Sequence, residues 1–236
     1  AYIVLATLSA PALYSLIADA QLVDMIAAGQ ALPEATGAML MLAAPDKLEL
    51  LGNSMTGEEA RGILDALRSI DPSLVTGLYE QALDPTMALG ILLSAHMIIF
   101  WLSQDSNVTP PVCLTAFAAA AIAGTRQIPT GFTAWKLAKG LYIMPVLFAY
   151  TPLLYGDWAV ALEIFFFALL GLYSFAAAFQ GYLERDHGVV ARVFLGIVAI
   201  CLLYPEQRLL HWFALAAFTL FFIWDYMMAR KAGTTS

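Results

Sequence analysis

The chain has 236 residues, of which 61% are hydrophobic and 12% are charged, and its formal net charge is −7. This composition, with a mean hydropathy of +0.77, excludes an ordinary soluble domain and indicates a membrane protein in contact with the lipid bilayer. The acidic balance also argues against nucleic acid as a partner. Both cysteines lie in apolar segments, where they behave as small hydrophobic residues, so no disulfide framework is expected.

The first element is an apolar segment, residues 1–18, whose length is about that of one membrane span. It contains Pro11, and we expect it to end at Asp19. It either crosses the membrane fully or forms the exit arm of a re-entrant hairpin. Because the sequence begins with neither a methionine nor a basic leader and cleavage motif, we interpret the chain as a piece of a longer protein.

The next segment, residues 19–84, differs in character, since residues 46–84 carry eight acidic and three basic residues. Apolar residues recur here at helical spacing, which predicts amphipathic helices rather than membrane spans. Thr56-Gly57-Glu58-Glu59 fits the capped start of one helix. The pairs Asp71-Pro72 and Asp84-Pro85 mark the ends of two helices. We therefore expect residues 19–84 to form an amphipathic, acidic, extracytoplasmic insert.

A polar stretch with two prolines, residues 106–112, separates two apolar runs, 87–102 and 113–124. Neither run reaches the roughly 20 residues that a spanning helix needs, so we expect them to form one span together. The paired prolines remove backbone donors and bias Thr109 away from helical geometry, which predicts a break near the middle of this span. Such breaks are tolerated where they are buried or line a polar cavity, and transporters build substrate and ion sites from them.

Residues 126–140 combine Trp135 with Lys136 and Lys139, which is typical of a basic helix lying in the interfacial plane of a membrane. An ordinary connecting helix is the alternative. Four further apolar segments are expected to be spans: 141–155, 158–183, 189–204 and 209–229. We group residues 85–155 as the discontinuous helix, the interfacial arm helix and the following span, and 156–236 as additional C-terminal transmembrane helices.

The distribution of basic residues predicts the orientation. If the broken helix runs from outside to inside, three independent loops obey the positive-inside rule. The C-terminus would then lie in the cytoplasm and the acidic insert outside, in a multi-pass protein of a bacterial or archaeal cytoplasmic membrane. Glu163 and Asp225 fall within apolar runs, where an acid is either functional or engaged in snorkelling or interhelical hydrogen bonding. Both alternatives stay open.

Several of these segments resemble a known family. The opening residues 1–8, Ala10-Pro11-Ala12-Leu13, and Val108-Thr109-Pro110-Pro111-Val112 leading into the alanine run 116–123 resemble the large membrane subunit of TRAP transporters. The likeness is strongest to the fused permease of the TAXI branch. It covers residues 1–16 and 96–154 and is looser over the last spans. It implies an all-α elevator-type secondary transporter, in which residues 1–18 are the exit arm of the second re-entrant hairpin.

The resemblance also implies a function and a site. The family imports small organic anions, such as dicarboxylates, that an extracytoplasmic substrate-binding protein delivers. Na⁺ is the coupling ion, and the candidate ligands at the break are Ser106, Asn107, Thr109, Pro110 and Pro111, whose oxygens suit a hard cation. The start of the following half-helix would meet the substrate carboxylate, and its candidate residues are Val112, Cys113, Leu114 and Thr115.

The sequence departs from the family pattern at three places. Cys113 stands where Gly or Ala is usual, and Asn107 stands where relatives often have Asp, so one carboxylate is lost from the cation site. The insert at 19–84 replaces a short connection, and we expect it to shape binding-protein docking or the interface between the stationary and mobile domains.

Two other classes of function are kept as alternatives. One is a non-transporting membrane scaffold whose acidic insert binds a partner. The other is an intramembrane enzyme, for which no Ser/His pair, His-Glu-x-x-His helix or pair of facing acids is evident. We expect no covalent chemistry, and we interpret His96 as a helix-packing residue rather than a proton carrier.

Overall fold

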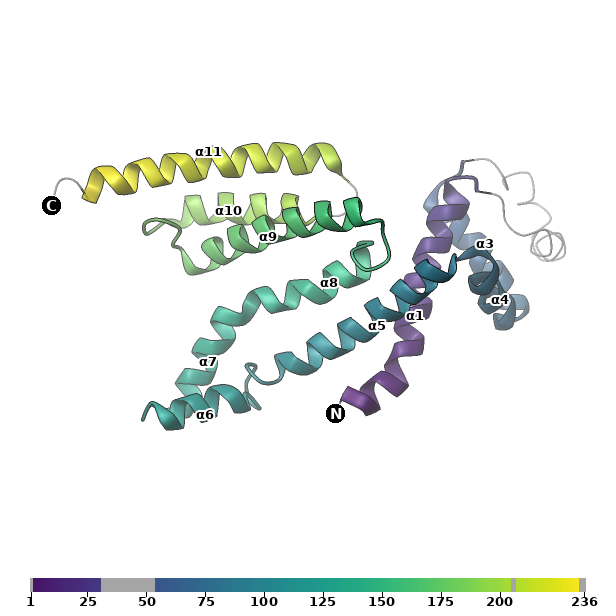
Figure 1. Cartoon of the computed structure of the whole chain (residues 1–236), viewed down its shortest axis with the longest axis horizontal. Coiled ribbons are helices and arrows are strands. Elements are labelled where there is room, and N and C mark those ends of the chain that lie inside the picture. The colour runs from purple at the N-terminus through teal and green to yellow at the C-terminus, as the bar shows by residue number, and fades with distance from the viewer. Residues whose placement is uncertain (1, 31–53, 205–206, 234–236) are drawn as a thin grey trace. The chain divides into compact units, whose positions relative to one another are not determined.

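The computed structural model describes residues 2–30, 54–204 and 207–233 (Figure 1). Within these ranges every regular element is a helix, and an isolated bridge joins Tyr182 and Asp186. The expected all-α class is therefore confirmed. Four of the described helices are long and apolar enough to cross a membrane, which indicates a multi-pass membrane protein: Ile3–Ala27, Pro85–Asp105, Trp158–Gln180 and Arg208–Lys231. The elevator arrangement and the re-entrant hairpin stay predictions.

The chain divides into two compact units, Ala1–Ile99 and Phe100–Ser236. The first unit holds α1 (Tyr2–Ala27), α3 (Gly57–Ile70), α4 (Pro72–Ala82) and the first part of α5 (Pro85–Asp105). In this unit α1 packs on α3 and α4. A small cluster of Ala6, Ala10, Leu13 and Ile99 joins α1 to α5.

The expected end of the first helix at Asp19 is wrong, because α1 continues to Ala27. The Asp19 carboxylate does not terminate the helix, since it accepts hydrogen bonds at 2.8 and 2.7 Å from Arg68 of α3 and at 2.7 Å from the Tyr79 hydroxyl of α4. Beyond Asp19 the side chains of Leu22, Val23 and Ile26 are buried. Residues 19–27, which the sequence predicts as a separate amphipathic helix, are therefore the second half of α1. The Asp19 carboxylate joins this half to α3 and α4.

In the described part of the insert, residues 54–84, the helices begin and end where the sequence predicts. Thr56 and Glu59 form a reciprocal capping box at the start of α3. The Glu59 backbone N–H donates to the Thr56 hydroxyl at 3.3 Å, and the Thr56 backbone N–H donates to Glu59 Oε2 at 2.8 Å. Asp71 ends α3 and caps α4, which begins at Pro72, and α5 begins at Pro85. Residues 31–53 of the expected insert, with three of its acids, lie outside the described residues.

Lowering the pH is expected to loosen the start of α4. The Ser73 backbone N–H donates to Asp71 Oδ1 at 2.8 Å, and this bond lowers the pKa of the Asp71 carboxyl below its ordinary value of 3.8. The folded state thus favours the ionised form, so its stabilisation is fully present above pH 3.8 and is lost as the pH falls through the lowered folded pKa. An NMR titration of the Ser73 amide should show a midpoint below 3.8.

The Asp71→Ser variant is the matched control, because serine keeps a capping oxygen that does not titrate in this range. Its Ser73 amide should show no such transition. A transition of the same midpoint in this variant would contradict the assignment to Asp71.

The second unit begins with the end of α5 and continues through α6 (Leu114–Ile122), α7 (Gln127–Leu137), the 3₁₀ helix η2 (Ala138–Tyr142) and α8 (Ile143–Tyr150). The predicted helix at residues 126–140 is present as α7 and part of η2. Within the predicted span at 141–155, the α-helical part α8 has eight residues and directly follows η2, and the crossing itself stays a prediction. The helix α8 ends because Thr151 precedes Pro152, which disfavours helical geometry, and Thr151 is extended.

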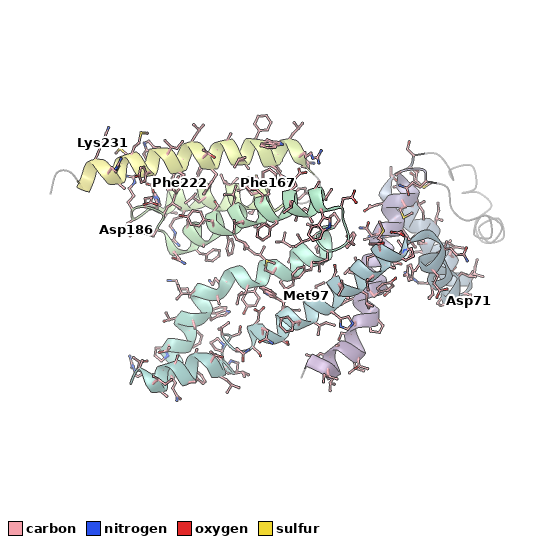
Figure 2. The ribbon with its side chains drawn as sticks, viewed as in Figure 1. Asp71, Met97, Phe167, Asp186, Phe222 and Lys231 are labelled. Atoms are coloured by element: carbon pink, nitrogen blue, oxygen red, sulfur yellow. The ribbon has the colours of Figure 1, made fainter. Side chains whose placement is uncertain are left out.

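Three apolar helices complete this unit: α9 (Trp158–Gln180), α10 (Val189–Leu203) and α11 (Arg208–Gly233). They match the predicted segments to within a few residues, although α10 has 15 residues and is shorter than a typical span. The face of α9 toward α10 consists of small buried residues, including Gly171 and Ser174, so the two backbones approach closely. Phe167 and Phe222 belong to the apolar cluster of the three helices (Figure 2).

The two acids within apolar runs are both paired with arginine. Glu163 of α9 accepts bonds at 3.0 and 2.8 Å from Arg208 at the start of α11. Asp225 of α11 is fully buried and binds the loop between α9 and α10. The alternative of interhelical hydrogen bonding is therefore correct for Glu163, and Asp225 serves to fasten a loop to a helix.

Candidate functional site

The helix is interrupted at the twin prolines, as predicted. α5 ends at Asp105, α6 begins at Leu114, and the residues between them form turns that include a cis Pro110–Pro111 bond. The expectation that neither flanking helix could span a membrane alone is wrong for α5, which has 21 residues. It extends further than expected because Ser103, Gln104 and Asp105 continue the helix beyond the apolar run.

The first residues of the break fold back onto the last turn of α5. The backbone N–H groups of Asn107 and Thr109 donate to Gln104 O at 2.9 Å and Asp105 O at 3.0 Å. The Ser106 hydroxyl donates to Ser103 O at 2.7 Å. Asn107 Nδ2 donates to Gln104 Oε1 at 3.1 Å, and this bond does not use the Asn107 side-chain oxygen, Oδ1. Both candidate side chains therefore keep oxygen lone pairs while their donors are used locally.

Unpaired backbone oxygens follow at the centre of the break. Among the described residues, no backbone hydrogen bond is accepted by the carbonyls of Pro110, Pro111 or Val112. The described part of the chain also contains no group of three His, Cys, Asp or Glu side chains placed to hold a metal ion. The donors at the break are thus hydroxyl and carbonyl oxygens, which fit a hard cation such as Na⁺ and do not fit a soft metal.

Thr109 is held by a residue that the sequence analysis missed. Its hydroxyl lies 2.6 Å from the Tyr142 hydroxyl, which also accepts a hydrogen bond at 3.2 Å from Trp135 Nε1. Trp101 of α5 donates to the Leu141 carbonyl at 2.9 Å, so η2 is hydrogen-bonded both to α5 and to Thr109. The sequence offers no local signal for Tyr142, because it lies 33 residues from Thr109.

The start of α6 offers backbone donors. The N–H groups of Leu114, Thr115 and Ala116 donate no backbone hydrogen bond within the described residues, as expected at a helix N-terminus. Val112 is 52% and Leu114 65% exposed, and Thr115 is exposed as well. These groups could meet an anion at the open end of the half-helix.

Cys113 differs from the other candidate substrate residues, because its side chain is fully buried. It packs against Gly131 of α7, where an added Cβ would meet the Cys113 sulfur at 2.7 Å. Cys113 therefore presents no side-chain atom to a ligand. The glycine opposite explains how a cysteine occupies a position where the resembling family has a smaller residue.

A buried acid lies directly before the break. Asp105 is 5% exposed, and neither of its carboxylate oxygens has a hydrogen-bond partner among the described residues. An intramembrane acid without a partner is a functional candidate by default. Asp105 is not among the site residues predicted from the sequence, although its position before the break was a usable signal.

The first unit contains a separate groove of about 920 Å³ between α1, α4 and α5. Its lining is mainly apolar, and its polar residues include Tyr14, Tyr79 and His96. None of the predicted site residues lines it. The predicted site thus lies within the second unit, around the break.

No family model, curated protein or solved structure matches the chain. The resemblance to TRAP permeases therefore stays a prediction from the residues of the two motifs.

Proposed function

We propose that the chain is the permease component of a TRAP-type secondary transporter, which imports a small carboxylate with Na⁺ and receives it from an extracytoplasmic binding protein. The observation that carries this proposal is the interrupted helix between α5 and α6. Unpaired carbonyls at Pro110 to Val112 and unpaired N–H groups at the start of α6 lie next to each other along the chain. Transporter binding sites are typically formed by interrupted helices with such groups.

The polar groups at the break fall into two sets, one suited to a cation and one suited to an anion. Carbonyl oxygens and the Thr109 hydroxyl suit a cation, whereas the N–H groups of Leu114 and Thr115 suit a carboxylate. Tyr142 holds Thr109 in place through its hydroxyl. A bound Na⁺ ion supplies positive charge that offsets the substrate anion, so that the two are carried together.

The placement of basic residues supports a cytoplasmic C-terminus. Arg185 contacts Asp225 near the end of α11, and Arg192 donates to the last carbonyls of α9. Asp186 in the α9–α10 loop and Lys231 in α11 lie at this same end of the three helices (Figure 2). By the positive-inside rule this end faces the cytoplasm of a bacterial or archaeal cell, and the acidic insert then faces the side where a binding protein docks.

Uptake by the full-length protein in liposomes tests the proposal. With the binding protein present, an inward Na⁺ gradient should drive accumulation of a labelled C4 dicarboxylate, and an equal K⁺ gradient should not. Thr109→Val should raise the Na⁺ concentration needed for half-maximal uptake by about tenfold, because one hydroxyl ligand is lost. The matched control is Thr133→Val, since the Thr133 hydroxyl bonds only within α7.

Uptake that does not depend on Na⁺, or a Thr109→Val variant equal to the wild type, would contradict the proposal. Capture of a partner by the insert without any uptake would favour the scaffold, and peptide cleavage would favour an intramembrane enzyme.

A further inference from the structure

We propose that the Asp105 carboxylate supplies the negative charge of the cation site at the break. The inference rests on the proposed Na⁺-coupled function and assigns to it a residue outside the predicted ligand set. Its basis is the buried carboxylate itself, which is 5% exposed and has no hydrogen-bond partner among the described residues.

Asp105 differs from three other acids within the candidate spans. Asp19 is paired with Arg68 and Tyr79, Glu163 with Arg208, and Asp225 with Arg185. A buried carboxylate is costly unless a cation or several donors compensate it. Since the described chain pairs each of those acids with an arginine, the exception at Asp105 points to a cation that the chain does not itself provide.

The surroundings of Asp105 fit a bound cation better than a structural partner. The Asp105 carbonyl accepts the N–H groups of both Val108 and Thr109, which places the break directly over the last turn of α5. The C-terminal end of a helix carries partial negative charge, and this adds to the charge of the carboxylate. Carboxylate, hydroxyl and carbonyl oxygens together form the kind of ligand set that a hard cation prefers.

The test measures Na⁺ binding by thermal stability, without transport. The full-length wild type and Asp105→Asn are purified in detergent, and the melting temperature is followed as NaCl replaces choline chloride. Na⁺ should stabilise the wild type through its preferential binding to the folded state. In Asp105→Asn the Na⁺ concentration for half-maximal stabilisation should rise roughly 10- to 100-fold, because a charged ligand is lost.

A second signature separates a cation ligand from a structural residue. Without Na⁺, Asp105→Asn should melt at a higher temperature than the wild type, because an uncompensated buried charge is removed. A residue that held the fold together would melt lower. The control is Asp157→Asn, an exposed acid in the same unit whose side chain makes no capping bond, and it should leave both readings unchanged.

An unaltered Na⁺ response in Asp105→Asn would overturn the inference, as would a lower melting temperature in choline with the Na⁺ response retained. Wild-type protein that is stabilised by Na⁺ but shows no Na⁺-driven uptake would contradict the proposed transport and leave the assignment of Asp105 supported. Na⁺-driven uptake by the wild type, together with normal Na⁺ binding by Asp105→Asn, would support the proposed transport and contradict the assignment of Asp105.

Discussion

Replacing Asp225 by alanine is expected to destabilise the full-length protein by about 3 kcal/mol, the low end for removal of one member of a buried ion pair. The Asp225 side chain is fully buried and binds three groups of the α9–α10 loop. These are the Glu184 N–H at 3.1 Å, the Arg185 guanidinium, and His187 Nε2 at 3.1 Å. The His187 side chain is only 2% exposed, so removal of the carboxylate leaves its Nε2 without this hydrogen-bond partner, whereas the partly exposed Arg185 regains some solvation.

The measurement is reversible unfolding in mixed detergent micelles, monitored by far-UV circular dichroism. Asp157→Ala is the matched control, because Asp157 is exposed and makes no capping bond, and it should change stability by less than about 0.5 kcal/mol. Equal stability of Asp225→Ala and the wild type would show that the loop is not fastened to α11 through this carboxylate.

The Gly171→Ala variant is expected to lose about 1 to 3 kcal/mol through overpacking between α9 and α10. A Cβ added at Gly171 would lie 2.6 Å from Leu203 Cγ and 3.3 Å from Leu202 Cβ. Leu202 is buried, so α10 cannot retreat without opening the apolar cluster of the three helices. The same unfolding experiment measures this loss.

Gly196→Ala in α10 provides the contrast. An added Cβ there has nothing within 4 Å, so the substitution should be neutral or stabilise α10 by up to about 1 kcal/mol through its helix propensity. The two variants carry the same chemical change and differ in their surroundings. If both shifted stability in the same direction and by the same amount, close packing of α9 on α10 would not be the reason.

Features with a local cause were predictable from the sequence. The Thr56 capping box, the turns at Asp71-Pro72 and Asp84-Pro85, and the break at Pro110-Pro111 each follow from residues within one helical turn of each other. Proline and capping side chains act on the adjacent backbone, so their effect does not depend on the rest of the fold.

Features that depend on distant partners were not predictable. Asp19 was expected to end a helix, yet Arg68, 49 residues away, compensates it and the helix continues. Tyr142 and Thr109 are 33 residues apart, and Arg185 and Asp225 are 40 apart. A single sequence carries no signal for such pairs, because the packing that joins them is decided by the whole unit.

Equilibrium binding of radioactive sodium to the purified full-length protein tests the central claim most directly, namely that oxygens at the interrupted helix hold Na⁺. The account predicts saturable binding that unlabelled Na⁺ displaces, K⁺ does not displace, and Thr109→Val weakens by about tenfold. Absence of saturable binding in the wild type, or full binding in Thr109→Val, would contradict it.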